Sequence, residues 1–482
     1  MKLRYLCLII ILFSTLTLMG QTTLQLSGLN EMEFVYRTAP DSLNVYFRDA
    51  FAFNMGYRNF SFGMKFIAEL PKHGIDQTGL YQNLQPGSLN LGWQELYASY
   101  TKGAYSINAG TTEETFGRGL SFRSYKDLEF DEDHRLESFL LRYDDDLQFK
   151  AIYGAIESPT YIDQYDLAYG TDLSYPILSG VRLGGTAMAF RNLQAFARYS
   201  QREVYAGRLQ LNLGGLDAYG EYAKSESYRL IGSPTTFGSA IYASGDYNLG
   251  ALSFGGAYKK YDKFNYRLQD LPMVNYHEET LSDALASGFD EEGWQARSTL
   301  YLGETISISG DYAEAWNSSK EKRMNDLYAL LDYSNDGKIL QASFSHVEKV
   351  DDAFSTWQKE QTPALGFGTK IFGKALHGTA EFKLVEKQLF ADSYSHYEPK
   401  IQADLSLGKL SVSIGSQSNW EDFSSIMESR YWLNTEIKYP LFPQSEIIVF
   451  AGKEAGGKVC RNGVCRYVAP FEGLKVELNT RF

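Results

Sequence analysis

Residues 473–482 read GLKVELNTRF, and this stretch decides the fold. Two sets of side chains alternate strictly along it: Leu474, Val476, Leu478, Thr480 and Phe482 on one face, and Lys475, Glu477, Asn479 and Arg481 on the other. Because successive side chains of a strand point to opposite faces, this strand has hydrocarbon on one side and water on the other. The ending therefore predicts a transmembrane β-barrel rather than a soluble core.

The terminal aromatic residue also predicts a compartment. A strand that ends in Phe482 resembles the signal by which the barrel assembly machinery of Gram-negative bacteria recognises outer-membrane proteins. We therefore expect the apolar face, made of Leu474, Val476, Leu478, Thr480 and Phe482, to act as an assembly signal. The expected location is the bacterial outer membrane, where a multi-pass β-barrel contacts outer-membrane lipid.

The first 20 residues have the pattern of an export signal. Lys2 and Arg4 precede an apolar run that ends near Leu18, and Gly20 offers a small residue for cleavage before Gln21. The run is shorter than the ~20 residues of a transmembrane helix. We expect residues 1–20 to be a signal peptide and residues 21–482 to form a single barrel domain.

The charge balance narrows the expected partners. The 482 residues carry a formal charge of −13, which disfavours nucleic acid. Aromatic residues make up 15% of the chain, as expected where rings gather at the two membrane surfaces. No apolar run after residue 20 approaches the ~18 residues of a spanning helix, whereas a barrel needs only every second residue to be apolar.

Alternating segments recur along the whole chain and predict an all-β, antiparallel barrel of about 24 strands, with 22 and 26 as alternatives. The ambiguity lies between residues 178 and 213, where Val181 to Ser200 is expected to form one long strand that turns near Gln201 and Arg202. Tight glycine turns, such as Phe372-Gly373-Lys374, alternate with longer links. The longer links are predicted near residues 264–292, 318–324, 349–361, 388–397, 419–428 and 454–470.

A barrel this wide leaks unless its lumen is partly filled, and two of its own loops are long enough to fill it. The first, residues 111–135, places glycines at 117 and 119 around an arginine. Its charged residues are candidates for a constriction: Glu113, Glu114, Arg118, Arg123, Lys126 and Asp127. In this interpretation Arg118 and Arg123 face the acidic residues across the lumen. The alternative is a solvated external loop whose charges satisfy one another.

The second loop, about residues 264–293, contains a segment from Glu278 to Ala286 with helical character ahead of Ser287-Gly288. It is expected to cover the mouth of the barrel, and a disordered surface loop is the alternative. Burial is expected for its apolar residues, which are Leu271, Met273, Val274, Leu281 and Leu285.

Cys460 and Cys465 flank Arg461-Asn462-Gly463-Val464, and Asn-Gly is a strong signal for a two-residue hairpin turn. Such a turn places the two cysteines opposite each other, so we expect a disulfide in an oxidising envelope.

Catalysis, cofactors and metals are not expected. The six histidines fall in different predicted hairpins, and no nucleophile-base spacing is present. The acidic run 131–133 lacks the spacing of an EF-hand loop, so a solvated charge run is the expected role.

Two stretches carry a family resemblance. The segment 116–120, Phe-Gly-Arg-Gly-Leu, with Phe122, Arg123 and Tyr125 after it, and the ending from Cys460 into the last strand resemble an uncharacterised family of outer-membrane barrels from Bacteroidota. The family pattern has an aromatic residue where this chain has Thr112. The resemblance implies the fold and the compartment, and it transfers no catalytic residue.

Two functions are therefore expected as alternatives. The first is a porin-like channel or transport conduit that passes a polar solute past the loop at residues 111–135. The second is a sealed barrel that serves as a structural or assembly partner for surface lipoproteins or a secretion system.

Overall fold

The computed structural model describes residues 24–38, 45–70, 89–127, 132–158, 165–194, 198–228, 235–274, 288–389, 392–420, 430–461, 464–468 and 470–482. The predicted signal peptide, residues 1–20, lies outside the described residues, as does the predicted lid helix from 278 to 286.

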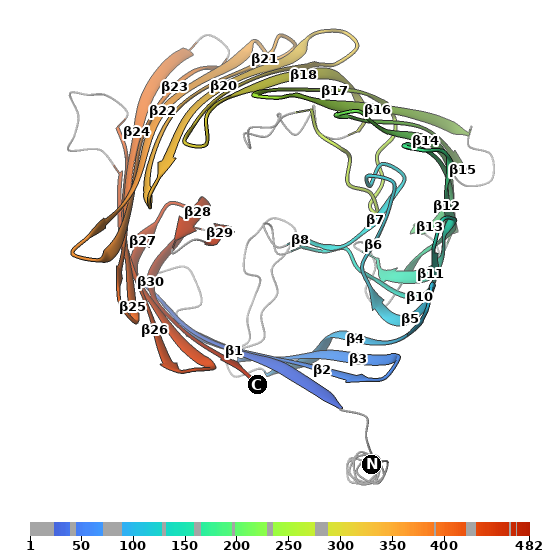
Figure 1. The fold of residues 1–482 in the computed structure, drawn as a ribbon, viewed down its shortest axis with the longest axis horizontal. Helices are drawn as coiled ribbons and strands as arrows, with labels where there is room; N and C mark the ends of the chain where they lie inside the picture. Colours follow the sequence, from blue (N-terminus) through green and yellow to red (C-terminus); the bar gives the residue numbers. More distant parts are fainter. Residues whose placement is uncertain are drawn as a thin grey trace.

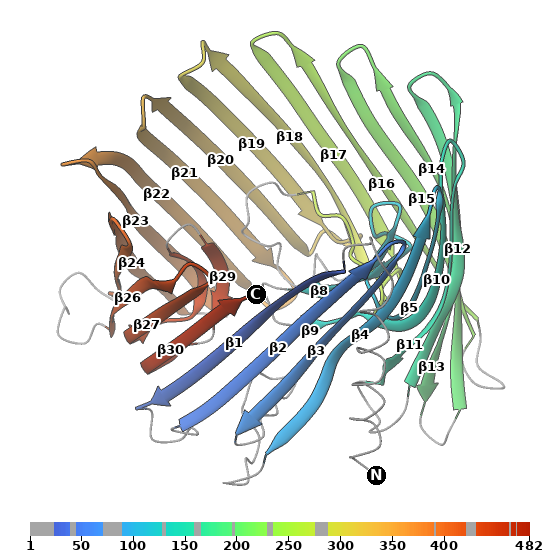
Figure 2. The same cartoon turned by 60° about the horizontal axis from the view of Figure 1, so that its bottom comes forward.

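A single antiparallel sheet of 24 strands closes on itself into a barrel (Figure 1, Figure 2). Its strands are β1 (Gln25–Arg37), β2 (Val45–Tyr57), β3 (Phe60–Leu70), β4 (Asn90–Lys102), β5 (Tyr105–Thr112), β10 (Leu136–Asp144), β11 (Gln148–Glu157), β12 (Tyr165–Leu178), β13 (Val181–Gln194), β14 (Arg198–Leu213), β15 (Leu216–Tyr228), β16 (Thr236–Leu249), β17 (Leu252–Asp262), β18 (Asp290–Leu302), β19 (Ile306–Trp316), β20 (Lys322–Asn335), β21 (Lys338–Asp351), β22 (Thr356–Ile371), β23 (Lys374–Leu389), β24 (Asp392–Leu407), β25 (Leu410–Asn419), β26 (Arg430–Phe442), β27 (Ser445–Glu454) and β30 (Phe471–Arg481). The predicted fold class and strand number are confirmed.

Six shorter strands form three two-stranded pieces off the wall. They are β6 (Glu114–Phe116) with β7 (Phe122–Ser124), β8 (Lys126–Asp127) with β9 (Glu132–Asp133), and β28 (Gly457–Arg461) with β29 (Val464–Val468). Figure 1 shows β6, β7 and β8 inside the outline of the barrel, on the side of β10 and β11.

Alternation explains why the wall faces lipid. Large apolar side chains recur at every second position and stay exposed on the outside, for example Leu365 at 58%, Ile401 at 61% and Leu433 at 64%. Hydrogen bonds between neighbouring strands satisfy most of the backbone of the wall, and hydrocarbon cannot supply such bonds. The chain is thus a multi-pass barrel of the outer membrane. In the described part of the chain, no helix is long and apolar enough to span a bilayer.

The closing seam is built by the C-terminal strand. β30 pairs with β27 on one side and with β1 on the other, where Val476 lies opposite Phe34. Phe482 exchanges two backbone hydrogen bonds with Gly28, at 2.8 and 3.1 Å. A Cβ atom at Gly28 would lie 2.2 Å from the Phe482 ring, so glycine is required there for close approach. The ring also stacks on Phe51 at 5.7 Å.

The predicted turn near Gln201 and Arg202 is wrong. β13 extends to Gln194 and β14 begins at Arg198, so Gln201 lies within a strand, opposite Arg191. Two predicted long links, 349–361 and 388–397, are also wrong, because Asp351 pairs with Thr356 and Leu389 with Asp392. The polar residues at these ends belong to the strands, because strands of 16 residues extend beyond the ~25 Å apolar band and have water on both faces there.

Candidate lumen site

The inner loop, residues 111–135, begins where β5 parts from β4 at Gly110, and it leaves the wall after Thr112, the last residue paired with β10. This glycine has φ +110°, and a Cβ atom there would lie 2.1 Å from the carbonyl oxygen of Leu96. Only glycine makes the sharp departure without a clash. The loop returns at Leu136, which pairs with Thr112. An insertion of 23 residues between two paired positions therefore projects from the end of one hairpin into the barrel.

The tip of the inner loop is an apolar plug. Phe116, Leu120 and Phe122 are fully buried, and the rings of Phe116 and Phe122 lie 5.0 Å apart. They belong to one cluster with inward-facing residues of β10 to β17, namely Leu136, Leu140, Ile152, Ile156, Ala168, Met188, Phe190, Val204, Tyr219, Ala223, Ala240, Tyr242 and Tyr261. We call the inner surface of these strands the apolar wall. Burial of this size fixes the loop against one side of the lumen.

The second loop, residues 263–289, completes the plug. Its Phe264, Leu268 and Val274 are buried in the same cluster, and Tyr266 donates its hydroxyl to the carbonyl oxygens of Leu120 and Ser121. Burial raises the pKa of Tyr266 well above its usual value, so the hydroxyl stays a donor. The prediction of burial is confirmed for Val274, whereas Met273 is 45% exposed; Leu281 and Leu285 lie outside the described residues.

Arg118 does not face the predicted acidic residues. Its guanidinium lies 4.5 Å from the centre of the Tyr219 ring and donates to Ser244 Oγ at 2.6 Å. The flanking Gly117 and Gly119 have φ +58° and +90°, which gives the loop the predicted sharp fold. Arg118 therefore anchors the tip to β15 and β16.

Arg123 likewise bonds elsewhere than predicted. It forms an ion pair with Asp270 of the second loop, and its guanidinium lies 4.1 Å from the centre of the Tyr125 ring. Two backbone bonds join the same loops: the Arg123 amide donates to Leu268 at 3.0 Å, and the Asp270 amide donates to Gly119 at 3.1 Å. The two loops thus form one body.

Glu114 is held by the wall. Its side chain is 7% exposed, and it accepts hydrogen bonds from Arg142 Nε at 2.6 Å and Lys150 Nζ at 2.8 Å. The predicted pairing of Arg118 and Arg123 with Glu113 and Glu114 is therefore wrong, because low solvent exposure inside the barrel favours partners fixed on the wall or the second loop. The side chain of Asp127 lies outside the described residues, and Lys126 precedes it in β8.

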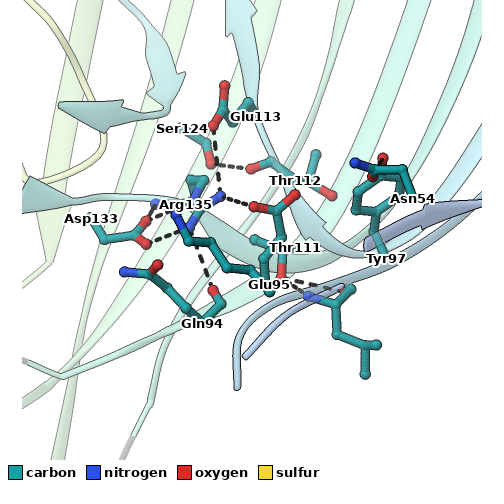
Figure 3. A network of polar contacts seen from close by, with 12 residues as sticks. Asn54, Gln94, Glu95, Tyr97, Thr111, Thr112, Glu113, Ser124, Asp133 and Arg135 are labelled. Atoms are coloured by element: carbon teal, nitrogen blue, oxygen red, sulfur yellow. Dashed lines mark hydrogen bonds and ion pairs between the residues drawn. The ribbon is translucent and has the colours of Figure 1, made fainter. Parts of the chain in front are cut away.

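A polar network ties the returning end of the inner loop to the wall (Figure 3). Arg135 has a side chain that is only 6% exposed, and it pairs with Glu95 at 2.9 Å, Asp133 at 2.7 Å and Glu113 at 3.8 Å. Burial opposes ionisation of Asp133, but hydrogen bonds and the charge of Arg135 prevail and hold its pKa below the usual value. No local pattern in the sequence indicates a partner for Arg135 on β4.

The opposite inner surface, on β20 to β26, is polar, and we call it the polar wall. Its inward residues form ion pairs between strands, such as Lys383 with Glu360 at 3.0 Å, Lys400 with Glu381 at 3.8 Å and Lys438 with Glu446 at 2.9 Å. Short hydroxyl residues, including Ser343, Thr362 and Ser411, lie between them on the same face. These groups suit contact with water.

A pocket of about 440 Å³ lies beside the plug, toward the tight-turn end of the barrel. Arg118 lines it from the plug, Tyr219 lines it from β15, and Arg182, Asn212 and Asp217 line it near the turns. Among described residues, no group of three or more His, Cys, Asp and Glu side chains is arranged to hold a metal ion.

The cysteine hairpin has the predicted register. β28 pairs with β29 so that Cys460 lies opposite Cys465 and Arg461 opposite Val464. The side chains of both cysteines, and the turn at residues 462 and 463, lie outside the described residues.

Comparison with known proteins identifies the family of this chain. A family model described as a family of unknown function (DUF6029) matches residues 1–286, more than half of the chain. The chain belongs to this family. A comparison with curated proteins found no match.

Solved structures support the fold. A chain of the E. coli P pilus tip assembly intermediate PapC-PapD-PapK-PapG is 10% identical, with a TM-score of 0.56 over 95% of this chain and 60% of that one. The siderophore receptor PirA from Pseudomonas aeruginosa is 10% identical, with a TM-score of 0.51 over 96% of this chain and 81% of that one. The DUF6029 protein therefore spans less than two thirds of the first of these chains. At such low identity the likeness concerns the fold alone.

Proposed function

We propose that this DUF6029 protein is a transport conduit for a polar solute, in which the inner loop narrows the lumen from one side. The observation that carries the proposal is the asymmetry of the interior. The plug packs on the apolar wall, while the inward surface of β20 to β26 carries paired charges and hydroxyl groups. Side chains of this kind stabilise hydrated solutes and ions, whereas burying them in a core without water costs free energy.

In this proposal Arg118 contacts the solute. It lines the 440 Å³ pocket together with Arg182, Gln210, Asn212 and Asp217. Amide, guanidinium and carboxylate groups suit a hydroxyl-rich solute such as an oligosaccharide, because they can donate hydrogen bonds to its hydroxyl groups and accept hydrogen bonds from them.

The proposal is tested by single-channel recording in planar bilayers. Residues 113–135 are replaced by Asn-Gly, which closes β5 and β10 as a tight hairpin because Thr112 and Leu136 are already paired. The matched control replaces residues 420–429, which join β25 to β26 in sequence, by Asn-Gly, since Asn419 and Arg430 are paired. We expect larger conductance steps only after removal of the inner loop. Silence of all three proteins would contradict a conduit and favour the sealed barrel that serves as an assembly partner.

The disulfide between Cys460 and Cys465 is also proposed, from the register of β28 and β29. Thiol labelling of the unfolded protein tests it. Neither cysteine should react before reduction, and labelling without reductant would contradict the bond. The Bacteroidota origin and the signal peptide likewise stay predictions.

A further inference from the structure

The wall has a notch beside β4. β4 pairs with β3 along its length, but β5 pairs only with its second half, from Tyr97 opposite Gly110 to Lys102 opposite Tyr105. The departure of the inner loop at Gly110 thus leaves residues 90–96 of β4 with no second strand among those that the structure describes. Inside a bilayer, an open strand edge is costly because lipid offers no hydrogen bonds.

Side chains satisfy only one end of this edge. The Leu96 amide donates to Thr111 Oγ1 at 2.9 Å, and the single hydroxyl proton of Thr111 lies between two acceptors, Glu137 Oε1 at 2.5 Å and the Leu96 carbonyl at 3.3 Å. Arg135 Nη2 reaches the carbonyl oxygen of Gln94 at 3.4 Å. No hydrogen bond of this kind is found among described residues for the backbone from 90 to 92, and a Cβ atom at Gly92 would meet nothing within 4 Å.

The edge lies on the lipid-facing part of the wall. Outward residues of the same segment are apolar and strongly exposed, with Leu91 at 58%, Trp93 at 63% and Leu96 at 44%. A pocket of about 510 Å³ opens beside it, between β4 and the ends of β10, β11 and β12. The charged residues that line this pocket are four acidic ones, Glu95, Asp133, Glu137 and Glu157, and two basic ones, Arg135 and Arg267. Its excess of acidic groups favours a basic occupant.

A second observation lies on the outer face next to the notch. Asp49 shares the outward face of β2 with Phe47 and Phe51, between Met32 of β1 and Ala68 of β3. Its Oδ1 is buried and accepts no hydrogen bond from described residues, as is also true of Asn30 Oδ1 on the same face. Ala68 is in turn paired with Leu91, so Asp49 is two strands from the β4 edge, about 10 Å away. A carboxylate on a lipid-facing surface is costly and calls for a donor.

From these observations we infer that the β1–β4 side of the barrel is a docking surface for a second, membrane-embedded protein. An extended segment of that partner pairs with residues 90–95 of β4, and a Lys or Arg side chain of the partner binds Asp49. The backbone needs partners in register, the acidic pocket favours a cation, and Asp49 requires a donor within the hydrocarbon. A lipid molecule satisfies none of these needs along a strand edge. This interaction is independent of conduction through the lumen.

The test is photo-crosslinking of the full chain in its native outer membrane. Leu91 and Trp93 are replaced, one at a time, by p-benzoylphenylalanine; Phe367 on β22, also outward and 47% exposed, is the control position. We expect adducts with one partner protein from Leu91 and Trp93 but not from Phe367. The two crosslinked partner residues should lie two apart in sequence, as in a strand, with a Lys or Arg nearby.

Two further measurements sharpen the result. Asp49→Leu should reduce the adduct yield several-fold, whereas Ser416→Leu, a polar outward residue on β25, should not. Amide exchange at residues 90–95 should be slower in native membrane vesicles than in purified protein, with β22 unchanged. Each of three results would overturn the proposal. These are adducts with lipid only, adducts within the same chain, and crosslinked partner residues that lie three or four apart in sequence, as in a helix. Heat-modifiable migration of every variant confirms that the barrel is folded.

Discussion

The apolar wall and the polar wall are built from strands of similar length with the same outward alternation, yet their inward faces differ. On β10 and β11 several inward positions are apolar, for example Leu140 and Ile152, which are buried under the inner loop, and the inward Arg142 and Lys150 bind its Glu114. On β23 the inward positions are charged, for example Glu381 and Lys383, and they pair with neighbouring strands. An apolar inward face thus marks the side that holds protein, and a polar one marks the side that faces water. The predictions below test this difference, and the first three share one readout.

The readout is the alkylation rate of Ser121→Cys in a chain whose native cysteines are replaced by Ser. Ser121 is fully buried in the plug and donates to Glu221 at 2.8 Å. A thiol there reacts only when the plug opens, so the rate reports the free energy of docking. A change of about 1.4 kcal/mol corresponds to a tenfold change in rate.

The largest effect is expected from Phe122→Ala. Loss of a fully buried ring costs about 3–5 kcal/mol, so the alkylation rate should rise at least about 100-fold. Phe344→Ala, on the outward face of β21 and 40% exposed, is the control and should leave the rate unchanged. Equal rates for the two variants would mean that the apolar cluster does not hold the plug.

A smaller effect is expected from Glu114→Ala. It leaves Arg142 and Lys150 without their shared carboxylate, which costs about 3 kcal/mol for a buried pair. The matched variant on the polar wall is Glu381→Ala, whose ion pair with Lys400 spans 3.8 Å and is more exposed. That variant should change the rate by less than about fivefold. If both variants change the alkylation rate equally, the burial of Glu114 makes no contribution to the free energy of docking.

A weaker contribution is expected from the pair that joins the two loops. Arg123 and Asp270 are each more than one third exposed, so the pair should contribute about 1 kcal/mol or less after solvent screening. Arg123→Gln and Asp270→Asn should each raise the alkylation rate by less than about tenfold, and the double variant should match the single ones. Strict additivity of the two substitutions would show that the side chains do not interact.

The smallest effect concerns pH. Because the folded pKa of Asp133 is lowered, its pairing with Arg135 stabilises the loop above the ordinary value of 3.8 and is lost as pH falls through the lower folded value. Accessibility of a thiol probe at residue 113, beside Arg135, should therefore be constant from neutral pH to near 3.8 and rise only below it. Accessibility is the maleimide labelling rate divided by the rate of the same thiol in the unfolded chain at the same pH, because the thiolate is the reacting form and its fraction falls with pH. Asp133→Asn should flatten this profile, and a rise at near-neutral pH in the parent chain would assign the change to another group.

The sequence by itself determined the 24-stranded wall of the barrel. Strict alternation in stretches such as 474–482 specified the fold class, the lipid-facing side chains and the approximate strand number, because the period of two is a local property of the backbone. The tertiary structure alone decided where the charged loop residues find partners. Arg118 contacts the ring of Tyr219, about 100 residues away in the chain, and Arg135 forms an ion pair with Glu95 on β4, beside the part of β4 that β5 does not pair with. The sequence also carries a signal of the filled lumen, because short segments such as 139–141 and 187–190 are apolar on both faces. Closure of the ring brings distant strands together, and no local pattern encodes that geometry.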